Sequence, residues 1–198
     1  MWNQRYDVPE YVFGTEPNQF LREQVRHLQP GMTVLAVADG EGRNGVWLAQ
    51  QDLAVWSVDA SSVAQTKARH LAAERGVTLH FECADMLTWD WGKQHFDAIV
   101  AIFIQFTGAA DRERLFSAMK LALNPGGVLL LQGYTPRQLE YRTGGPSVLE
   151  NLYTETIVRN MLDGLDIVQL REHDSQISEG AHHHGMSALI DVVAIKPK

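Results

Sequence analysis

The sequence has a single cysteine, no long apolar run and no excess of positive charge. Cys83 cannot form an intrachain disulfide, which excludes a disulfide scaffold and fits a reducing cytoplasm. No apolar run approaches the ~20 residues that a membrane-spanning helix needs, and the opening residues do not resemble a secretory signal. The 17 Lys and Arg against 24 Asp and Glu give a formal charge of −7, whereas nucleic-acid binding requires a basic face. We therefore expect a cytoplasmic protein without nucleic-acid or membrane partners.

The remaining composition is that of an ordinary globular chain. Hydrophobic residues make up 45% and charged residues 21% of the 198 residues, which excludes disordered and collagen-like chains. One hydrophobic core can serve a chain of this length. We expect one domain over residues 1–198, with a lid and a helix in 1–30 and the sheet core in 31–198. We expect a monomer or a homodimer.

Runs of β-branched and aliphatic residues predict the strands. Five such runs are residues 33–37, 54–58, 77–81, 97–103 and 128–131. None shows the polar alternation of a half-exposed strand, so we expect parallel strands covered on both faces. Two later runs, 165–170 and 188–195, have no helical pattern between them. They predict an antiparallel hairpin at one edge of the sheet, joined by a long polar loop.

Helical patterns alternate with the first five strands. They cover residues 43–51, 61–75, 111–123 and 147–163, and a further one at 17–28 precedes the first strand. Ser61 is a typical N-cap and Gly76 a typical stop signal, while Ser147 and Glu150 have capping-box spacing. Alternating strands and helices predict an α/β sheet with right-handed crossovers.

A glycine-rich turn, ADGEGRNG at residues 38–45, follows the first strand, and Asp59 ends the second. Backbone amides at such a turn approach a ligand closely, and an acid at the next strand's end can accept hydrogen bonds from ribose hydroxyls. The pattern predicts a nucleoside-containing ligand. Gly40, Gly42 and Gly45 also match the dinucleotide fingerprint, so an NAD(P)-dependent reductase is an alternative. The intervening Asp39 and the enlarged turn disfavour it.

The segment VLAVADGEGRNGVWLA resembles the first motif of class I S-adenosylmethionine-dependent methyltransferases. It most resembles a small bacterial branch related to the tellurite-resistance and thiopurine-type enzymes. Residues 11–18 (YVFGTEPN), 143–146 (TGGP) and 183–185 also match that branch. The resemblance implies a Rossmann-like, mostly parallel sheet of seven strands with helices on both faces. Its implied strand order is 3-2-1-4-5-7-6 with strand 7 antiparallel, and its implied cofactor is S-adenosyl-L-methionine.

The resemblance also implies cofactor-binding residues. They are Ala38, Gly40 and Gly42 at the amino-acid part of the cofactor, Asp59 at the ribose, Ala60, Asp85 and Met86 at the adenine, and Ile102 and Phe103 near the adenine and the methyl group. Three of these residues have structural alternatives, because Asp85 can cap a helix or a turn, and Ile102 and Phe103 on an apolar strand can be simple core. As a hypothesis, the aromatic segment 2–14 folds over the pocket as a lid, with Trp2 and Tyr11 covering it.

The expected acceptor is a small molecule such as a thiol or another soft nucleophile. Its pocket candidates are His183, Tyr141 and Gln105, with Phe106 and Tyr134 nearby. Relatives often have histidine at the position of Gln105, so a base is lost there. A partly ionised thiol does not need that base. His182–His184 suggest a metal, but adjacent residues of an extended segment point to opposite sides, and we expect no metal site. A non-catalytic S-adenosylmethionine-binding protein is a further alternative, because the family often has an acid at the position of Ala36.

Overall fold

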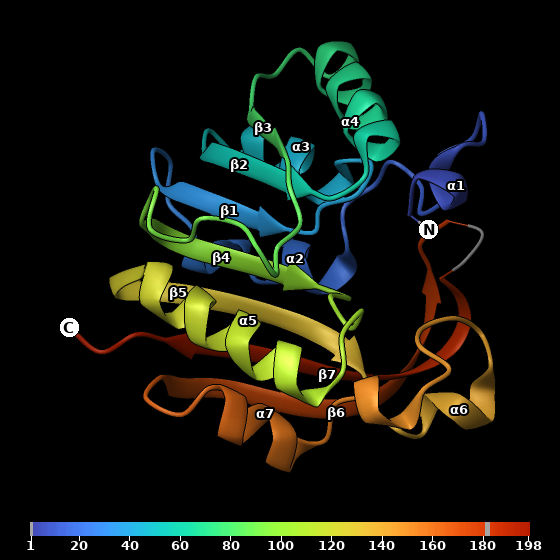
Figure 1. Cartoon of the computed structure of the whole chain (residues 1–198), viewed down its shortest axis with the longest axis vertical. Helices are drawn as coiled ribbons and strands as arrows, with labels where there is room; N and C mark the ends of the chain where they lie inside the picture. Colours follow the sequence, from blue (N-terminus) through green and yellow to red (C-terminus); the bar gives the residue numbers. More distant parts are fainter. Residues whose placement is uncertain (1, 181–182) are drawn as a thin grey trace.

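The computed structural model describes residues 2–180 and 183–198. Its strands are β1 (Thr33–Val37), β2 (Ala54–Asp59), β3 (His80–Cys83), β4 (Phe96–Ile102), β5 (Leu123–Tyr134), β6 (Asp166–Ser178) and β7 (His184–Ile195). They form one seven-stranded sheet in the order β3-β2-β1-β4-β5-β7-β6. β7 runs antiparallel to both of its neighbours, and the other pairs are parallel (Figure 1). The predicted fold class and strand order are confirmed.

Helices cover both faces of this sheet. They are α1 (Trp2–Tyr6), α2 (Gln19–Glu23), η1 (Val25–His27), α3 (Arg43–Ala49), α4 (Ser62–Glu74), α5 (Ala109–Ala122), α6 (Gln138–Tyr141), η2 (Leu149–Asn151) and α7 (Glu155–Met161). Leu35 and Leu131 pack on the face covered by α5 and α7, while Val34 and Leu130 pack on the opposite face with α2 and α3. Successive strand residues point to opposite faces, so both faces must be apolar, as the continuous runs predicted.

Several boundaries differ from the sequence prediction: the fifth strand is Leu123–Tyr134 instead of 128–131, and the helix predicted over 17–28 is α2 followed by η1. In two further cases tertiary contacts override local signals. The helix predicted over 147–163 begins only at Glu155, where the Thr154 hydroxyl accepts from the Ile157 amide at 3.2 Å. Glu150 does not form a capping box, since its Oε1 accepts from the Ala109 amide at the start of α5. The third strand begins at His80, not 77, because the Val77 amide still bonds to the Ala72 carbonyl in the turn after α4.

The C-terminal hairpin is longer than predicted. β6 and β7 pair continuously toward their turn, out to Ser178 opposite His184, so much of the expected long polar loop is strand. A polar pair joins the two strands in this outer part, with His173 Nε2 2.9 Å from Asp191 Oδ2. The extension brings the hairpin to the side of the molecule toward which β1 and β4 point, near α1 and α6 (Figure 1).

Candidate active site

A cavity of about 610 Å³ opens where β1, β2, β4 and β5 end. The carboxyl ends of parallel strands are the usual binding edge of an open α/β sheet. Its lining includes ten of the thirteen predicted site residues. They are Ala38, Gly40, Asp59, Ala60, Asp85, Met86, Ile102, Phe103, Gln105 and His183. Gly42, Tyr11 and Tyr141 do not line it.

The glycine turn and the end of β2 are tied together by Asp59. Its Oδ2 accepts from the Gly40 amide at 2.9 Å and its Oδ1 from the Ser61 amide at 2.8 Å. Burial raises the pKa of Asp59, and these two hydrogen bonds oppose that rise. Gly40 has a φ of +58°, and a Cβ there would lie 2.9 Å from the Tyr6 hydroxyl. A side chain at this position would therefore require the Tyr6 hydroxyl to shift.

A second carboxyl group, Asp39, lies beneath the turn. Its Oδ2 accepts from the Ser57 hydroxyl at 2.7 Å and its Oδ1 from the Gly45 amide at 3.1 Å. Burial raises the pKa of Asp39 to about 7. A Cβ on Gly45 would overlap Asp39 Oδ2. The third glycine of the fingerprint-like pattern therefore makes room for a buried acid.

The three residues outside the cavity have other contacts. Gly42 has a φ of +85°, and a Cβ there would lie 2.7 Å from Ala68 Cβ, so it permits close packing of the turn against α4. The Tyr11 hydroxyl donates to the Lys67 carbonyl at 3.2 Å. The Tyr141 hydroxyl donates to Asp174 Oδ2 at 2.9 Å. The structure does not bring Gly42, Tyr11 or Tyr141 to the cavity.

Asp85 and Met86, which follow β3, each have a structural role and also line the cavity. Asp85 caps a turn, since its Oδ1 accepts from the Leu87 amide at 2.9 Å, and it also lines the cavity. Met86 is buried in the core and lines the cavity as well. Turn formation therefore holds the Asp85 carboxylate at the cavity edge.

The inner wall of the cavity is aromatic. The Phe103 ring stacks on Tyr134, with centroids 4.7 Å apart, and its backbone has a φ of +56°. The buried His183 ring lies 4.6 Å from Phe103 and 4.5 Å from Phe13, centroid to centroid. His182 lies outside the described residues. His184 is exposed, and its Nδ1 is 3.3 Å from the Ser178 hydroxyl.

Gln105 holds the end of β5 in place. Its Oε1 accepts from the Tyr134 amide at 2.6 Å, and its Nε2 donates to the carbonyls of Tyr134 and Asn151 at 2.8 and 2.9 Å. Both ends of the amide are therefore engaged with backbone. The side chain positions β5 beside β4, and it has no titratable group that could remove a proton.

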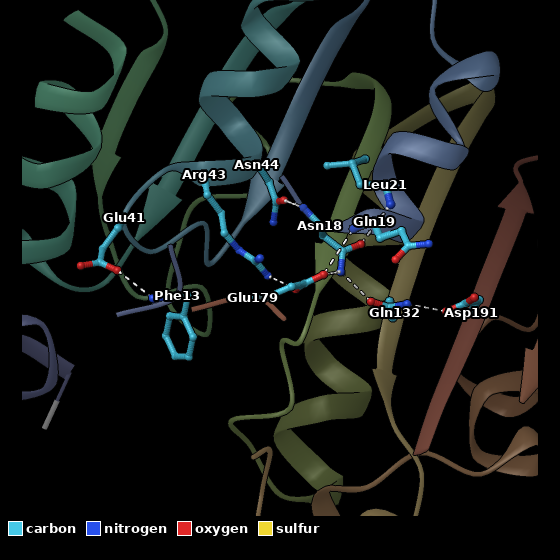
Figure 2. Close-up of polar contacts among 10 residues, drawn as sticks. All are labelled: Phe13, Asn18, Gln19, Leu21, Glu41, Arg43, Asn44, Gln132, Glu179 and Asp191. Atoms are coloured by element: carbon cyan, nitrogen blue, oxygen red, sulfur yellow. Dashed lines mark hydrogen bonds and ion pairs between the residues drawn. The ribbon is translucent and has the colours of Figure 1, made fainter. Parts of the chain in front are cut away.

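Sequence reasoning missed what the polar residues of the glycine turn do. Glu41 Oε2 accepts from the Val12 and Phe13 amides at 2.8 and 3.4 Å, and Asn44 Oδ1 accepts from the Asn18 amide at 2.9 Å. Figure 2 shows that the turn thereby holds the N-terminal segment. The segment in turn supplies Trp2, Arg5, Tyr6, Phe13 and Gly14 to the cavity lining. The available signal was three polar residues (Glu41, Arg43 and Asn44) directly around a buried glycine turn.

Arg43 connects the same turn to the C-terminal hairpin. Its Nη2 pairs with Glu179 Oε2 at 2.6 Å, and both side chains are almost fully buried. Glu179 Oε1 also accepts from Asn18 Nδ2, which donates to Gln132 Oε1 as well (Figure 2). Within residues 2–180 and 183–198, no three His, Cys, Asp or Glu side chains could together hold a metal ion. No helix in those residues is long and apolar enough to cross a membrane.

Comparisons with known proteins give a family match and a fold. Residues 34–127 match the family model of a methyltransferase domain. No curated protein sequence matches the chain. Among solved structures, the chain resembles a protein whose structure concerns the conversion of a disulfide bond into a thioacetal group during echinomycin biosynthesis. That alignment has a TM-score of 0.78 and 18% identity, and it covers 96% of this chain and 85% of the other.

Two further structures have the same arrangement. The N-methyltransferase NodS from Bradyrhizobium japonicum WM9, in complex with S-adenosyl-L-homocysteine, aligns with a TM-score of 0.75 and 14% identity, covering 100% of this chain and 97% of NodS. TehB from Haemophilus influenzae aligns with a TM-score of 0.73 and 14% identity, covering 98% of this chain and 65% of TehB. Such identities establish the fold alone, and the match to the methyltransferase-domain model covers residues 34–127, a little under half of the chain.

Proposed function

We propose that this protein transfers a methyl group from S-adenosyl-L-methionine to a small-molecule acceptor. The observation that carries the proposal is one cavity with a nucleoside-type end at Gly40 and Asp59 and an aromatic end at Phe103, Tyr134 and His183. The cofactor, when bound, supplies an electrophilic methyl group on a sulfonium. NodS, which shares the fold, has been crystallised with the demethylated cofactor S-adenosyl-L-homocysteine.

The residues present fit this cofactor. Gly40 lines the cavity without a side chain that could obstruct a ligand, and the Asp59 carboxylate lies at the cavity surface where ribose hydroxyls can donate to it. We assign cofactor contacts to Ala38, Gly40, Asp59, Ala60, Asp85, Met86, Ile102 and Phe103. Gly42 and Tyr11 support the site indirectly, through packing of the turn and of the N-terminal segment.

On the acceptor side, positioning and exclusion of water supply the catalysis. Gln105 is engaged with backbone and His183 is packed between aromatic rings. An acceptor that is already partly ionised, such as a thiol, reacts in such a pocket without a strong base. We assign His183 to acceptor contact, and Gln105 to placing the wall around the acceptor. Tyr141 lies outside the cavity lining and has no acceptor role in this proposal.

Calorimetric titration tests the cofactor. We expect binding of S-adenosylmethionine and S-adenosylhomocysteine and no binding of NAD. Binding of NAD with neither sulfur nucleoside would instead establish the reductase alternative. Asp59→Asn should weaken S-adenosylhomocysteine binding about 10- to 30-fold, because it replaces a charged acceptor of two ribose hydrogen bonds. Glu16→Asn, at an exposed ion pair with Arg75, is the control and should leave the affinity unchanged.

Methylation of a panel of thiols, metalloid oxyanions and small amines tests the reaction. Turnover of thiols or of another soft acceptor is the expected result. Cofactor binding without turnover of any panel member would favour the non-catalytic alternative that Ala36 suggests.

Further assignments accompany this proposal. We place the chain in the small branch related to tellurite-resistance and thiopurine-type enzymes, because the turn residues Glu41, Arg43 and Asn44 each have a contact in the structure. We treat residues 1–198 as one methyltransferase domain with 1–30 as its lid and first helix. A cytoplasmic location is proposed because the single cysteine, Cys83, is an exposed free thiol.

A further inference from the structure

A second cavity, of about 340 Å³, is lined by residues of α2 and of the β6–β7 hairpin. No described residue lines both this cavity and the one at the ends of the parallel strands. Three residues of its lining are hydrogen-bonded in series: Ser175, His173 and Asp191. A hydroxyl, an imidazole and a carboxylate in this order are the parts of an activated serine nucleophile.

The sheet brings these three side chains to one face. His173 and Ser175 are two residues apart on β6, so their side chains point the same way. Leu189 is the register partner of His173, and Asp191 lies two residues further along β7, on the same face. The Ser175 hydroxyl lies 2.7 Å from His173 Nδ1, and His173 Nε2 lies 2.9 Å from Asp191 Oδ2. Ser175 is half-buried, so a small ligand in the cavity can reach its hydroxyl.

The neighbours of Asp191 determine which imidazole nitrogen carries the proton. Gln132 Oε1 accepts from Asn18 Nδ2 at 2.7 Å, so the other end of this amide, Nε2, donates to Asp191 Oδ1 at 2.6 Å (Figure 2). An ionised carboxylate only accepts hydrogen bonds, so His173 Nε2 carries the proton and donates it to Asp191. His173 Nδ1 then accepts from the Ser175 hydroxyl. The two nitrogens exchange the roles that they have in common serine hydrolases, but the chemistry requires only that one accepts and the other donates.

Asp191 is an unusual residue for its position. It is buried, and it interrupts the apolar run Ala188–Ile195 of β7, an inner strand of the sheet. Burial raises the pKa of Asp191, and the hydrogen bonds from Gln132 and His173 oppose that rise. An apolar residue would serve the stability of the hairpin as well or better, because a buried carboxylate is costly even when it is paired. A buried acid that orients a histidine in a cavity is typical of functional sites.

We propose that Ser175 is a second reactive nucleophile of this protein and hydrolyses small carboxylic esters, independently of methyl transfer. In the first step the bond from Ser175 Oγ to the acyl carbon forms, the bond from that carbon to the alcohol oxygen breaks, and the serine proton passes through His173 to the leaving alcohol. In the second step water attacks the acyl carbon, and its proton passes through His173 to Ser175 Oγ as the carboxylic acid leaves. Arg171 also lines the cavity and supplies positive charge for the oxyanion. The cavity is at the small end of ligand pockets, so we expect a short acyl group.

Labelling with a small alkyl fluorophosphonate tests the nucleophile without any cofactor. An activated serine attacks its phosphorus: the Oγ–phosphorus bond forms, the phosphorus–fluorine bond breaks, and fluoride leaves while His173 takes the serine proton. Peptide mass spectrometry should locate the adduct on Ser175, and Ser175→Ala should abolish it. Ser178→Ala is the matched control and should be labelled at the wild-type rate. Ser178 is also on β6 and lies beside a histidine, His184, but no carboxylate contacts that histidine among the described residues.

A second variant separates activation of Ser175 from its accessibility. His173→Gln keeps a polar side chain but removes the general base, so labelling should slow about 100-fold, with thermal unfolding as the check that the variant is folded. Release of p-nitrophenol from p-nitrophenyl acetate should be about 10-fold faster with the wild type than with Ser175→Ala. An unlabelled wild type, labelling that persists in Ser175→Ala, or equal labelling rates of the wild type and folded His173→Gln would each overturn the proposal. The comparison with Ser175→Ala decides it even where His173→Gln does not fold.

Discussion

At the scale of single residues, Asp39 links the cofactor turn to the stability of the fold. It is 9% exposed and is held by Ser57 and Gly45. Its pKa rises from an ordinary value of 3.8 to about 7, chiefly because burial disfavours the charged form. The folded chain therefore holds this proton more tightly than the unfolded chain does, and its stability must depend on pH.

The direction in which the free energy of unfolding changes with pH follows from which state, folded or unfolded, loses the Asp39 proton at the lower pH. Between pH 4 and pH 7 the unfolded chain ionises at Asp39 while the folded chain stays protonated, so the free energy of unfolding falls as pH rises. The interval from 3.8 to about 7 corresponds to roughly 4 kcal/mol, which is present below pH 4 and lost above pH 7. The Asp39→Asn variant has no carboxyl proton at this position, so its stability lacks this contribution to the pH dependence. Urea unfolding at pH 4 to 8 should show the variant gaining stability relative to the wild type, and a constant difference would contradict the prediction.

The sequence predicts a site residue well when its place in the sheet decides where its side chain points, and poorly when a long-range contact does. Asp59 and Ile102 end parallel strands and Phe103 directly follows one. The sheet brings all such ends to one edge, so their place at the cavity was predictable. Tyr11 and Tyr141 lie in segments without periodicity, and their hydroxyls found partners at Lys67 and Asp174 instead. No local pattern encodes such long-range hydrogen bonds.

At the scale of elements, the N-terminal segment 2–14, part of which lines the cavity, is attached to the glycine turn by hydrogen bonds that its amides donate to Glu41. Glu41 binds the Val12 and Phe13 amides, and Lys67 bridges Glu41 to the Glu10 carbonyl. We expect S-adenosylhomocysteine to slow proteolysis within this segment, because the ligand fills the cavity that the segment lines. Limited proteolysis followed by mass spectrometry measures the rate, and equal rates with and without ligand would refute a lid.

Two variants test whether Glu41 attaches the N-terminal segment to the glycine turn. Glu41→Ala should speed cleavage of the segment several-fold without ligand, since it removes the acceptor of two backbone amides. Glu16→Ala is the control, because that side chain forms an exposed ion pair with Arg75.

Element type was more predictable than element ends. The five parallel strands and most helices follow from apolar runs and caps such as Ser61, whose hydroxyl accepts from the Ala64 amide. Short helices such as α1 and α6 give no periodic signal over four or five residues. The outer part of β6, residues 171–178, is polar except for Ile177, and β6 is an edge strand, so its sequence resembles a loop.

At the scale of the whole molecule, cofactor binding should raise the melting temperature. A ligand at 100 times its Kd adds about 2.7 kcal/mol to the folded state. For a chain of 198 residues this corresponds to a rise of roughly 5 to 10 °C. Thermal unfolding should show this shift with S-adenosylhomocysteine and none with NAD. A shift with NAD alone would contradict the assigned cofactor.

The antiparallel seventh strand has a consequence for synthesis of the protein. β5 is an inner strand of the sheet, yet the strand that completes its second side, β7, is made of residues 184–195. While the ribosome is still translating the preceding residues, the apolar stretch Leu129–Leu131 has an open backbone edge that other chains can pair with. Folding must therefore wait for the end of translation of this region.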